Sequence, residues 1–249
     1  PAYAVIESGD YDGDGTADAA VFRPSAALWS IRNLTRAYFG ASSDLPASAD
    51  YDGDGTSDLA VFRATAGLWS VRNLTRIYLG STGDLSVPGN YAGSGGARAA
   101  VFRPAAGMWS IRDLTRSYFG GTADVPVPAD YSAAGLCDIA VFRPASGLWS
   151  VLALTRLYLG SPGDQVAPAD YGGDGGAEPA IFRSSSGMWS VRNLTRVFFG
   201  QAADQAVPAD FLGAGLSEIA VFRAQDSLWS VRNATRIYLG STGDWPVTK

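Results

Sequence analysis

Hydrophobic and polar residues follow the same order every 40 residues along this chain. Within residues 47–86, short runs rich in Val, Phe, Trp, Tyr and Leu are separated by Gly, Asp, Asn and Pro. Such runs and breaks are typical of short strands joined by turns. The pattern predicts strands over 58–63, 68–72 and 75–80, with a short fourth strand over 87–89. No window of ten residues has the 3.6-residue period of a helix, so we expect an all-β chain.

Six copies of one aromatic-arginine phrase mark the period, with no insertion or deletion between them. The copies are VFRPSAALWS at 21–30, VFRATAGLWS at 61–70, VFRPAAGMWS at 101–110, VFRPASGLWS at 141–150, IFRSSSGMWS at 181–190 and VFRAQDSLWS at 221–230. A fixed period of this size is typical of solenoids, arrays and propellers. Four strands in 40 residues match one propeller blade.

The faces of the predicted strands distinguish these architectures. Ala60 and Phe62 point to one face of their strand, and Leu59 and Val61 point to the other. A sheet with one face in water would alternate apolar and polar residues, whereas a blade stacked between two neighbours need not. The repeats at the two ends also lack the polar caps that a solenoid needs. We therefore predict a single domain over 1–249, a six-bladed β-propeller with four antiparallel strands per blade.

The two ends of the chain compete for one strand position. Residues 5–9 precede the first acidic loop, in the position of the first strand of a blade. Residues 245–248 align with the same position one period after the last repeat. We expect Val5–Gly9 to fill it and the C-terminal segment to lie over the junction.

Two loops carry closely spaced carboxylates, DYDGDGTAD at 10–18 and DYDGDGTSD at 50–58. Two like charges at about 4 Å repel by about 4 kcal/mol at an effective dielectric constant of 20, and Ca²⁺ relieves this by taking six to eight oxygen ligands. An EF-hand is excluded because its position 12 would be Val21 or Val61, where Glu is required. The predicted ligands, with the threonines acting through their carbonyls, are Asp10, Asp12, Asp14, Thr16 and Asp18 in the first loop and Asp50, Asp52, Asp54, Thr56 and Asp58 in the second.

The four other loops keep fewer carboxylates. The fifth retains Asp170, Asp174 and Glu178 and is a weaker candidate, whereas we predict no metal in the third, fourth and sixth. In the third loop Arg98 stands where the first two loops have Asp, and it could supply the positive charge itself. Calcium would then act as a local staple in part of the ring.

The phrase DYDGDGTSDLAVFR, with FGGTADVPVPAD at 119–130, resembles the FG-GAP/VCBS repeat family over nearly the whole chain. The family includes secreted bacterial proteins, the integrin α-subunit propeller and fungal propeller lectins. The resemblance implies a propeller with calcium loops, and a role in adhesion, glycan binding or as an accessory domain. Three of the six loops depart from the calcium pattern.

Other residues recur once in each repeat and form predicted rings. The tryptophans could pack between blades, which we favour, or offer stacking platforms for sugars; they are Trp29, Trp69, Trp109, Trp149, Trp189 and Trp229. Arg23, Arg36 and their equivalents recur in every repeat, Arg32 recurs in all but the fourth, and an acidic ring begins at Asp44. We expect Arg–Asp ties, with sugar or anion binding by the Arg32 ring as the alternative. Asn33-Leu34-Thr35 and similar triplets match glycosylation acceptors, but we interpret them as turns.

Composition limits the function. The chain has a net charge of −5 and no histidine, which argues against a nucleic-acid ligand and removes Ser-His and Cys-His catalysis. The one cysteine, Cys137, has no partner for an internal disulfide, and no apolar run approaches the length of a membrane span. We expect a non-enzymatic, extracellular monomer that binds a glycan or, alternatively, a protein surface. An enzyme is a third possibility, and an engineered or recently amplified repeat scaffold without a ligand is a fourth.

Overall fold

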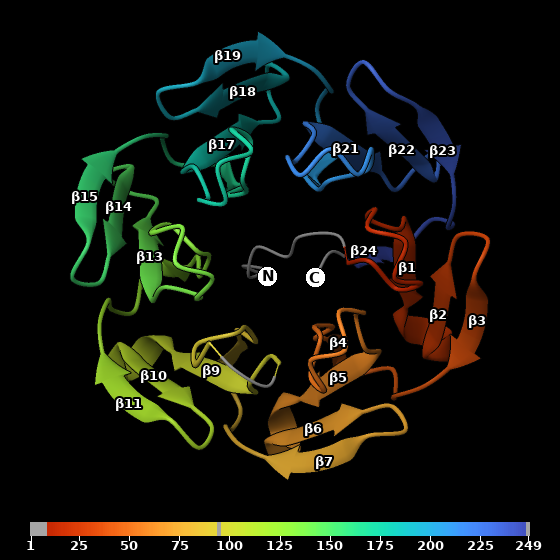
Figure 1. The fold of residues 1–249 in the computed structure, drawn as a ribbon, viewed down its shortest axis with the longest axis vertical. Helices are drawn as coiled ribbons and strands as arrows, with labels where there is room; N and C mark the ends of the chain where they lie inside the picture. The colour runs from red at the N-terminus through yellow and green to blue at the C-terminus, as the bar shows by residue number, and fades with distance from the viewer. Residues whose placement is uncertain (1–8, 94–95, 248–249) are drawn as a thin grey trace.

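The computed structural model describes residues 9–93 and 96–247, and they form six four-stranded antiparallel sheets. Figure 1 shows the sheets set radially about one axis, with the second strand of each sheet near the axis and the fourth at the circumference. The predicted all-β, six-bladed propeller is confirmed. The described residues contain no helix that is both long and apolar enough to cross a membrane.

The strands of each blade run outward in chain order, except that the last strand of the chain belongs to the first blade. From the first (inner) to the fourth (outer) strand, the first blade contains β24 (Trp245–Val247), β1 (Ala20–Arg23), β2 (Leu28–Ile31) and β3 (Thr35–Tyr38), and the second contains β4 (Leu45–Pro46), β5 (Ala60–Arg63), β6 (Leu68–Val71) and β7 (Thr75–Tyr78). The third blade contains β8 (Leu85–Ser86), β9 (Ala100–Arg103), β10 (Met108–Ile111) and β11 (Thr115–Tyr118), and the fourth contains β12 (Val125–Pro126), β13 (Ala140–Arg143), β14 (Leu148–Val151) and β15 (Thr155–Tyr158). The fifth blade contains β16 (Gln165–Val166), β17 (Ala180–Arg183), β18 (Met188–Val191) and β19 (Thr195–Phe198), and the sixth contains β20 (Gln205–Ala206), β21 (Ala220–Arg223), β22 (Leu228–Val231) and β23 (Arg236–Tyr238). Short 3₁₀ turns follow the second strand at Pro24–Ala26, Ala64–Ala66 and Pro104–Ala106.

The core lies between blades because the second strand of each blade is apolar on both faces. In the second blade Phe62 is paired with Trp69 across β5 and β6, with ring centroids 4.8 Å apart. Both side chains are fully buried and pack with Val101 of the third blade, while Val61 on the opposite face packs into the first blade. The two-faced apolar pattern is therefore the pattern of a stacked blade.

The tight hairpin between the third and fourth strands needs a left-handed residue. Asn73 has φ of 61°, and Asn33, Asn193 and Asn233 have φ between 58° and 60°. Asparagine tolerates this conformation better than most residues, so the predicted role of these residues in turns is confirmed.

The inner strand begins earlier than the sequence pattern indicated. The strand expected over 87–89 is β8 at Leu85–Ser86. Pairing continues beyond it, because the Val87 amide donates to the Ala100 carbonyl at 2.8 Å. Pro88 has no N–H to donate, and pairing resumes only as a single bridge between Gly89 and Arg98. The second blade has the same break between β4 and the single bridge of Ala49 with Asp58, although Ser48 stands there in place of the proline, so the break belongs to the shape of the blade.

The C-terminal segment closes the ring, and the expectation that Val5–Gly9 would do so is wrong. β24 pairs with β1, with Trp245 opposite Phe22 and Val247 opposite Ala20. Val247 is fully buried, and the Trp245 ring packs 6.3 Å from that of Phe22. Gly9 keeps part of the expected position, since its carbonyl accepts the Asp18 amide at 2.9 Å. Residues 5–8 lie outside the described residues.

Backbone hydrogen bonds join the loops between the first and second strands of neighbouring blades. The eighth residue of each loop donates its amide to the carbonyl of the first residue of the preceding loop, at 2.5–2.7 Å. The pairs are Ser57 to Asp10, Ala97 to Asp50, Cys137 to Asn90, Ala177 to Asp130, Ser217 to Asp170 and Ala17 to Asp210. The six loops thus form a closed ring near the axis (Figure 1).

Candidate metal centres and candidate binding surface

The first acidic loop curls around its own carboxylates. Asp10 accepts the amides of Gly13 and Gly15 at 2.6 and 2.9 Å, and Asp18 accepts the Tyr11 amide at 2.8 Å. Gly13 and Gly15 have φ of 78° and 84°, a conformation that side chains disfavour. The glycines of the motif therefore let the loop turn back on Asp10.

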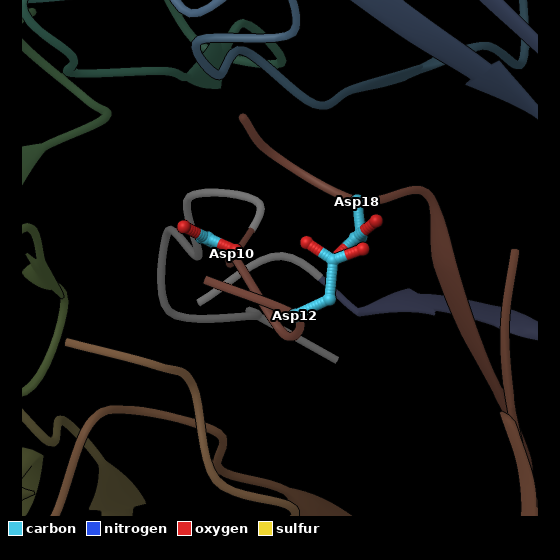
Figure 2. A group of neighbouring side chains, drawn as sticks. All are labelled: Asp10, Asp12 and Asp18. Carbon is cyan, nitrogen blue, oxygen red and sulfur yellow. The ribbon is translucent and has the colours of Figure 1, made fainter. Parts of the chain in front are cut away.

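Three of the predicted ligands in each of the first two loops come together. Asp10, Asp12 and Asp18 each place a carboxylate oxygen within 4.8 Å of the others, and Figure 2 shows the Asp12 and Asp18 side chains approaching each other. Asp50, Asp52 and Asp58 form the same arrangement in the second loop. These clusters of hard oxygen donors fit Ca²⁺.

Asp14 and Asp54 do not join these clusters. Asp14 Oδ1 instead accepts both the amide and the hydroxyl of Thr16, at 2.8 and 2.5 Å. Asp54 and Thr56 repeat these contacts in the second loop. The hydrogen bonds of the Thr16 hydroxyl and amide lower the pKa of Asp14. The predicted ligation by Asp14, Asp54 and the two threonine carbonyls stays a prediction.

In each of the first two clusters, the surroundings of one carboxyl disfavour its charged form. The pKa of Asp18 is raised, chiefly because the carboxyl is partly buried, and further because Asp12, Asp10 and Asp14 lie nearby. The Tyr11 amide opposes this rise in part. The pKa of Asp58 is raised by the same causes, burial first. A bound cation would stabilise the ionised form of Asp18 and Asp58, which burial and the neighbouring carboxylates penalise.

The fifth loop brings together Asp170, Asp174 and Glu178, its three predicted ligands. Among residues 9–93 and 96–247 no such cluster occurs in the third, fourth or sixth loop. In the third loop the Arg98 guanidinium donates to the Arg112 carbonyl at 3.4 Å. Carboxylate clusters thus occur in the first, second and fifth loops, the three loops that the sequence singled out as calcium candidates. Binding of calcium itself stays a prediction.

The six tryptophans of the predicted ring pack in the hydrophobic core. All six tryptophans are fully buried, and five of them donate the indole N–H to a backbone carbonyl, as Trp69 does to Leu79 at 3.1 Å. The interpretation as packing is confirmed, and no sugar can stack on these rings in the folded protein.

The Arg23 ring forms the expected ties with the acidic ring. Each guanidinium donates through Nε and Nη2 to both oxygens of one aspartate, as Arg63 does to Asp44 at 2.7 and 2.8 Å. The six pairs are Arg23–Asp244, Arg63–Asp44, Arg103–Asp84, Arg143–Asp124, Arg183–Asp164 and Arg223–Asp204. The aspartate side chains are almost inaccessible, so these pairs fix each inter-blade connection to its blade.

The fourth strands present a ring of exposed aromatic side chains that the sequence reasoning missed. They are 72–78% exposed, the most exposed large hydrophobic residues among those described. The ring comprises Tyr38, Tyr78, Tyr118, Tyr158, Phe198 and Tyr238. The signal was present in the repeated sequence Thr-Arg-x-Tyr/Phe, where strand alternation places the aromatic residue beside the exposed arginine.

A separate hollow of about 310 Å³ lies between the fourth and fifth blades. Thr155 and Leu157 of β15 line one side, and Glu178, Arg192 and Asn193 line the other. It therefore borders the acidic cluster of the fifth loop.

Comparison with known proteins shows similarity in fold only. No protein-family model matches the sequence, and no curated protein matches it either. Among solved structures, the chain is similar to BBS1N, described in a crystal structure of BBS1N in complex with ARL6DN soaked with mercury. The TM-score is 0.57 at 12% identity, over 94% of this chain and 80% of the other. The protein is thus a six-bladed β-propeller whose fold is similar to that of the BBS1 propeller.

Proposed function

We propose that this propeller is a non-enzymatic extracellular binding module whose ligands are glycans. The observation that carries the proposal is the ring of six aromatic side chains held 72–78% exposed on the outer strands. Burying such side chains against a ligand releases water from apolar surface. Aromatic rings combine an apolar body with, in tyrosine, a polar tip, which suits the alternating C–H and hydroxyl surfaces of a pyranose.

The closed ring of blades supports a multivalent mode of binding. Six similar surfaces on one rigid body can engage several sugars of one polymer or one coated surface. Linked sites of this kind can gain 10²–10⁴-fold in avidity without any new type of contact. Individual sites can therefore be shallow and weak.

Calcium belongs to the proposal as a structural staple. Asp10, Asp12 and Asp18, together with the equivalent residues of the second loop and the weaker fifth loop, would hold it. Extracellular calcium modules bind with dissociation constants of about 10⁻⁴–10⁻³ M, which suits exposed loops and an extracellular location. This arrangement, with the sequence resemblance, also supports a relationship to the FG-GAP/VCBS family.

The experiment is a glycan-array screen of the purified chain in calcium. We expect binding to a subset of glycans, and loss of that binding in a variant with Tyr38, Tyr78, Tyr118, Tyr158 and Tyr238 changed to Ala. The matched control changes the exposed hairpin leucines Leu34, Leu74, Leu114, Leu154 and Leu194 to Ala, and should bind normally. An array without any bound glycan would contradict the proposal.

A protein-adhesion domain is the second candidate, and the hairpin leucines favour it. These five side chains are 44–52% exposed at the tips of the hairpins between third and fourth strands. Exposed apolar groups that recur on one face can mark a protein interface. A blank glycan array, together with capture of a protein ligand lost only in the leucine variant, would support this function instead.

A further inference from the structure

On the outer strands, the exposed residues vary less between repeats than the inward-facing residue. Their exposed positions read Thr, Arg and an aromatic residue in all six repeats, whereas the inward position between Arg and the aromatic residue varies. That inward residue is Ala37, Ile77, Ser117, Leu157, Val197 and Ile237 in turn. Packing restricts buried positions most, so packing does not explain this pattern.

Two exposed positions in each inter-blade loop have diverged. The two exposed residues before the buried aspartate of each inter-blade loop are Ser-Ser, Thr-Gly, Thr-Ala, Pro-Gly, Ala-Ala and Thr-Gly in successive repeats. The repeats are therefore no longer identical copies at the surface. The retained Arg and aromatic residues point to a ligand that contacts both.

The arginine and the aromatic residue lie on the same side of each outer strand. In the first blade Arg36 is opposite Ser30 and Tyr38 is opposite Leu28, on the side away from Trp29. Arg36 and Tyr38 are two residues apart, so their side chains stand side by side on the pleat. Phe198 replaces tyrosine in the fifth blade, which indicates that the ligand contacts the ring and not the hydroxyl.

The outer strands carry arginines that are not in ion pairs. Within the described part of the chain, none of Arg36, Arg76, Arg116, Arg156, Arg196 and Arg236 belongs to an ion pair. The carboxylates are mostly in the loops near the axis or in the buried Arg–Asp pairs. Although the net charge is −5, the circumference therefore offers guanidinium groups with few acidic neighbours.

We propose that these outer strands, the Arg-aromatic belt, bind an anionic polysaccharide, with sugar rings on the aromatic side chains and carboxylate or sulfate groups on the arginines. This inference rests on the proposed glycan-binding function and adds the chemical class of the ligand and its location. A guanidinium binds carboxylate and sulfate through paired N–H donors, and repetition around the circumference allows one polymer to contact several blades. Charged residues on an edge strand can also serve to prevent pairing with another chain. That role would explain the arginines, but not the exposed aromatic residue beside each of them.

The test measures binding of the full chain to dextran, carboxymethyl-dextran and dextran sulfate by affinity electrophoresis, with a calcium-containing buffer throughout. The belt variant changes Arg36, Arg76, Arg116, Arg196 and Arg236 to Gln. The control variant changes Arg32, Arg72, Arg112, Arg192 and Arg232 to Gln, which removes the same charge from the same five blades. A third variant changes the five belt tyrosines to Ala and leaves every charge in place.

We expect the two charged polymers to bind and neutral dextran not to bind. Affinity should fall on the order of 10²-fold in the belt variant, because several linked contacts are lost together, and should remain near the wild-type value in the control variant. The tyrosine variant should also lose affinity, so the result does not depend on the belt variant remaining soluble.

Four outcomes would overturn the inference. Equal losses in the belt and control variants would show that only overall charge matters. Binding of single-stranded DNA as tight as that of dextran sulfate would identify a general polyanion surface. Neutral glycans bound on an array, with no charged polymer bound, would reject the anionic class and leave the proposed function intact, whereas no binding to any glycan would reject both.

Discussion

Asp44 illustrates how single residues stabilise each inter-blade connection. Its carboxylate is fully buried and accepts the Ala41 amide as well as two N–H groups of Arg63. A buried charge is costly unless it is paired. Arg63 supplies the paired N–H donors that this buried carboxylate requires, which explains why Arg and Asp recur together in all six repeats.

Replacing Arg63 by Ala should lower the free energy of unfolding by about 3 kcal/mol, because Asp44 would remain buried without its cation. Urea unfolding followed by tryptophan fluorescence measures the change. Arg76→Ala in the same blade is the control, and should change stability by less than about 0.5 kcal/mol because Arg76 is exposed. Similar effects of the two substitutions would refute the assigned role of Asp44.

At the scale of the element, the ring is closed by a strand from the opposite end of the chain. β24 supplies the innermost strand of a blade whose other three strands come from the first repeat. The ladder with β1 spans three residue pairs and places Val247 in the core of that blade. Closure therefore joins the two ends of the sequence by non-covalent contacts alone.

Deleting residues 245–249 should destabilise the propeller by about 3 kcal/mol or more, since Val247 and part of Trp245 would no longer be buried and β1 would lose a partner strand. Thermal unfolding measures the loss, and a synthetic peptide of residues 241–249 added in excess should restore part of it. Deletion of residues 248–249 alone is the control, because it leaves β24 whole. An unchanged melting temperature after the longer deletion would contradict closure by β24.

At the scale of the whole molecule, the six loops are linked by backbone hydrogen bonds but differ in their carboxylates. The first two and the fifth hold acidic clusters, so calcium would stabilise part of the ring only. At about 1 mM Ca²⁺ and a dissociation constant of about 0.1–1 mM, each site would add about 0.4–1.4 kcal/mol.

Removing calcium with EDTA should therefore lower the melting temperature, by about 2–4 °C for each kcal/mol lost in a chain of this size. The variant with Asp12, Asp52 and Asp174 changed to Asn should melt at the same temperature with and without calcium. Differential scanning calorimetry measures both. A wild-type protein insensitive to EDTA, or a triple variant as sensitive as wild type, would reject the metal assignment.

The sequence by itself determined the repeat, the blade and the separation of acidic loops into two groups. These features are local: they follow from strand alternation, from turn residues such as Asn73, and from carboxylates spaced within nine residues. The two-sided apolar pattern around Phe62 also required stacked blades, because no single sheet could bury both faces. The predicted ligands Asp10, Asp12 and Asp18 could be named because one short loop contains them all.

Only the tertiary structure decided which residues remain at the surface and how the ring closes. Tryptophan and tyrosine both recur every 40 residues, yet Trp69 lies between blades and Tyr78 lies at the circumference. Periodicity cannot separate the two, since burial depends on the distance of each strand from the axis. The choice of β24 for the inner strand likewise depends on contacts between residues more than 200 positions apart, which no local pattern contains.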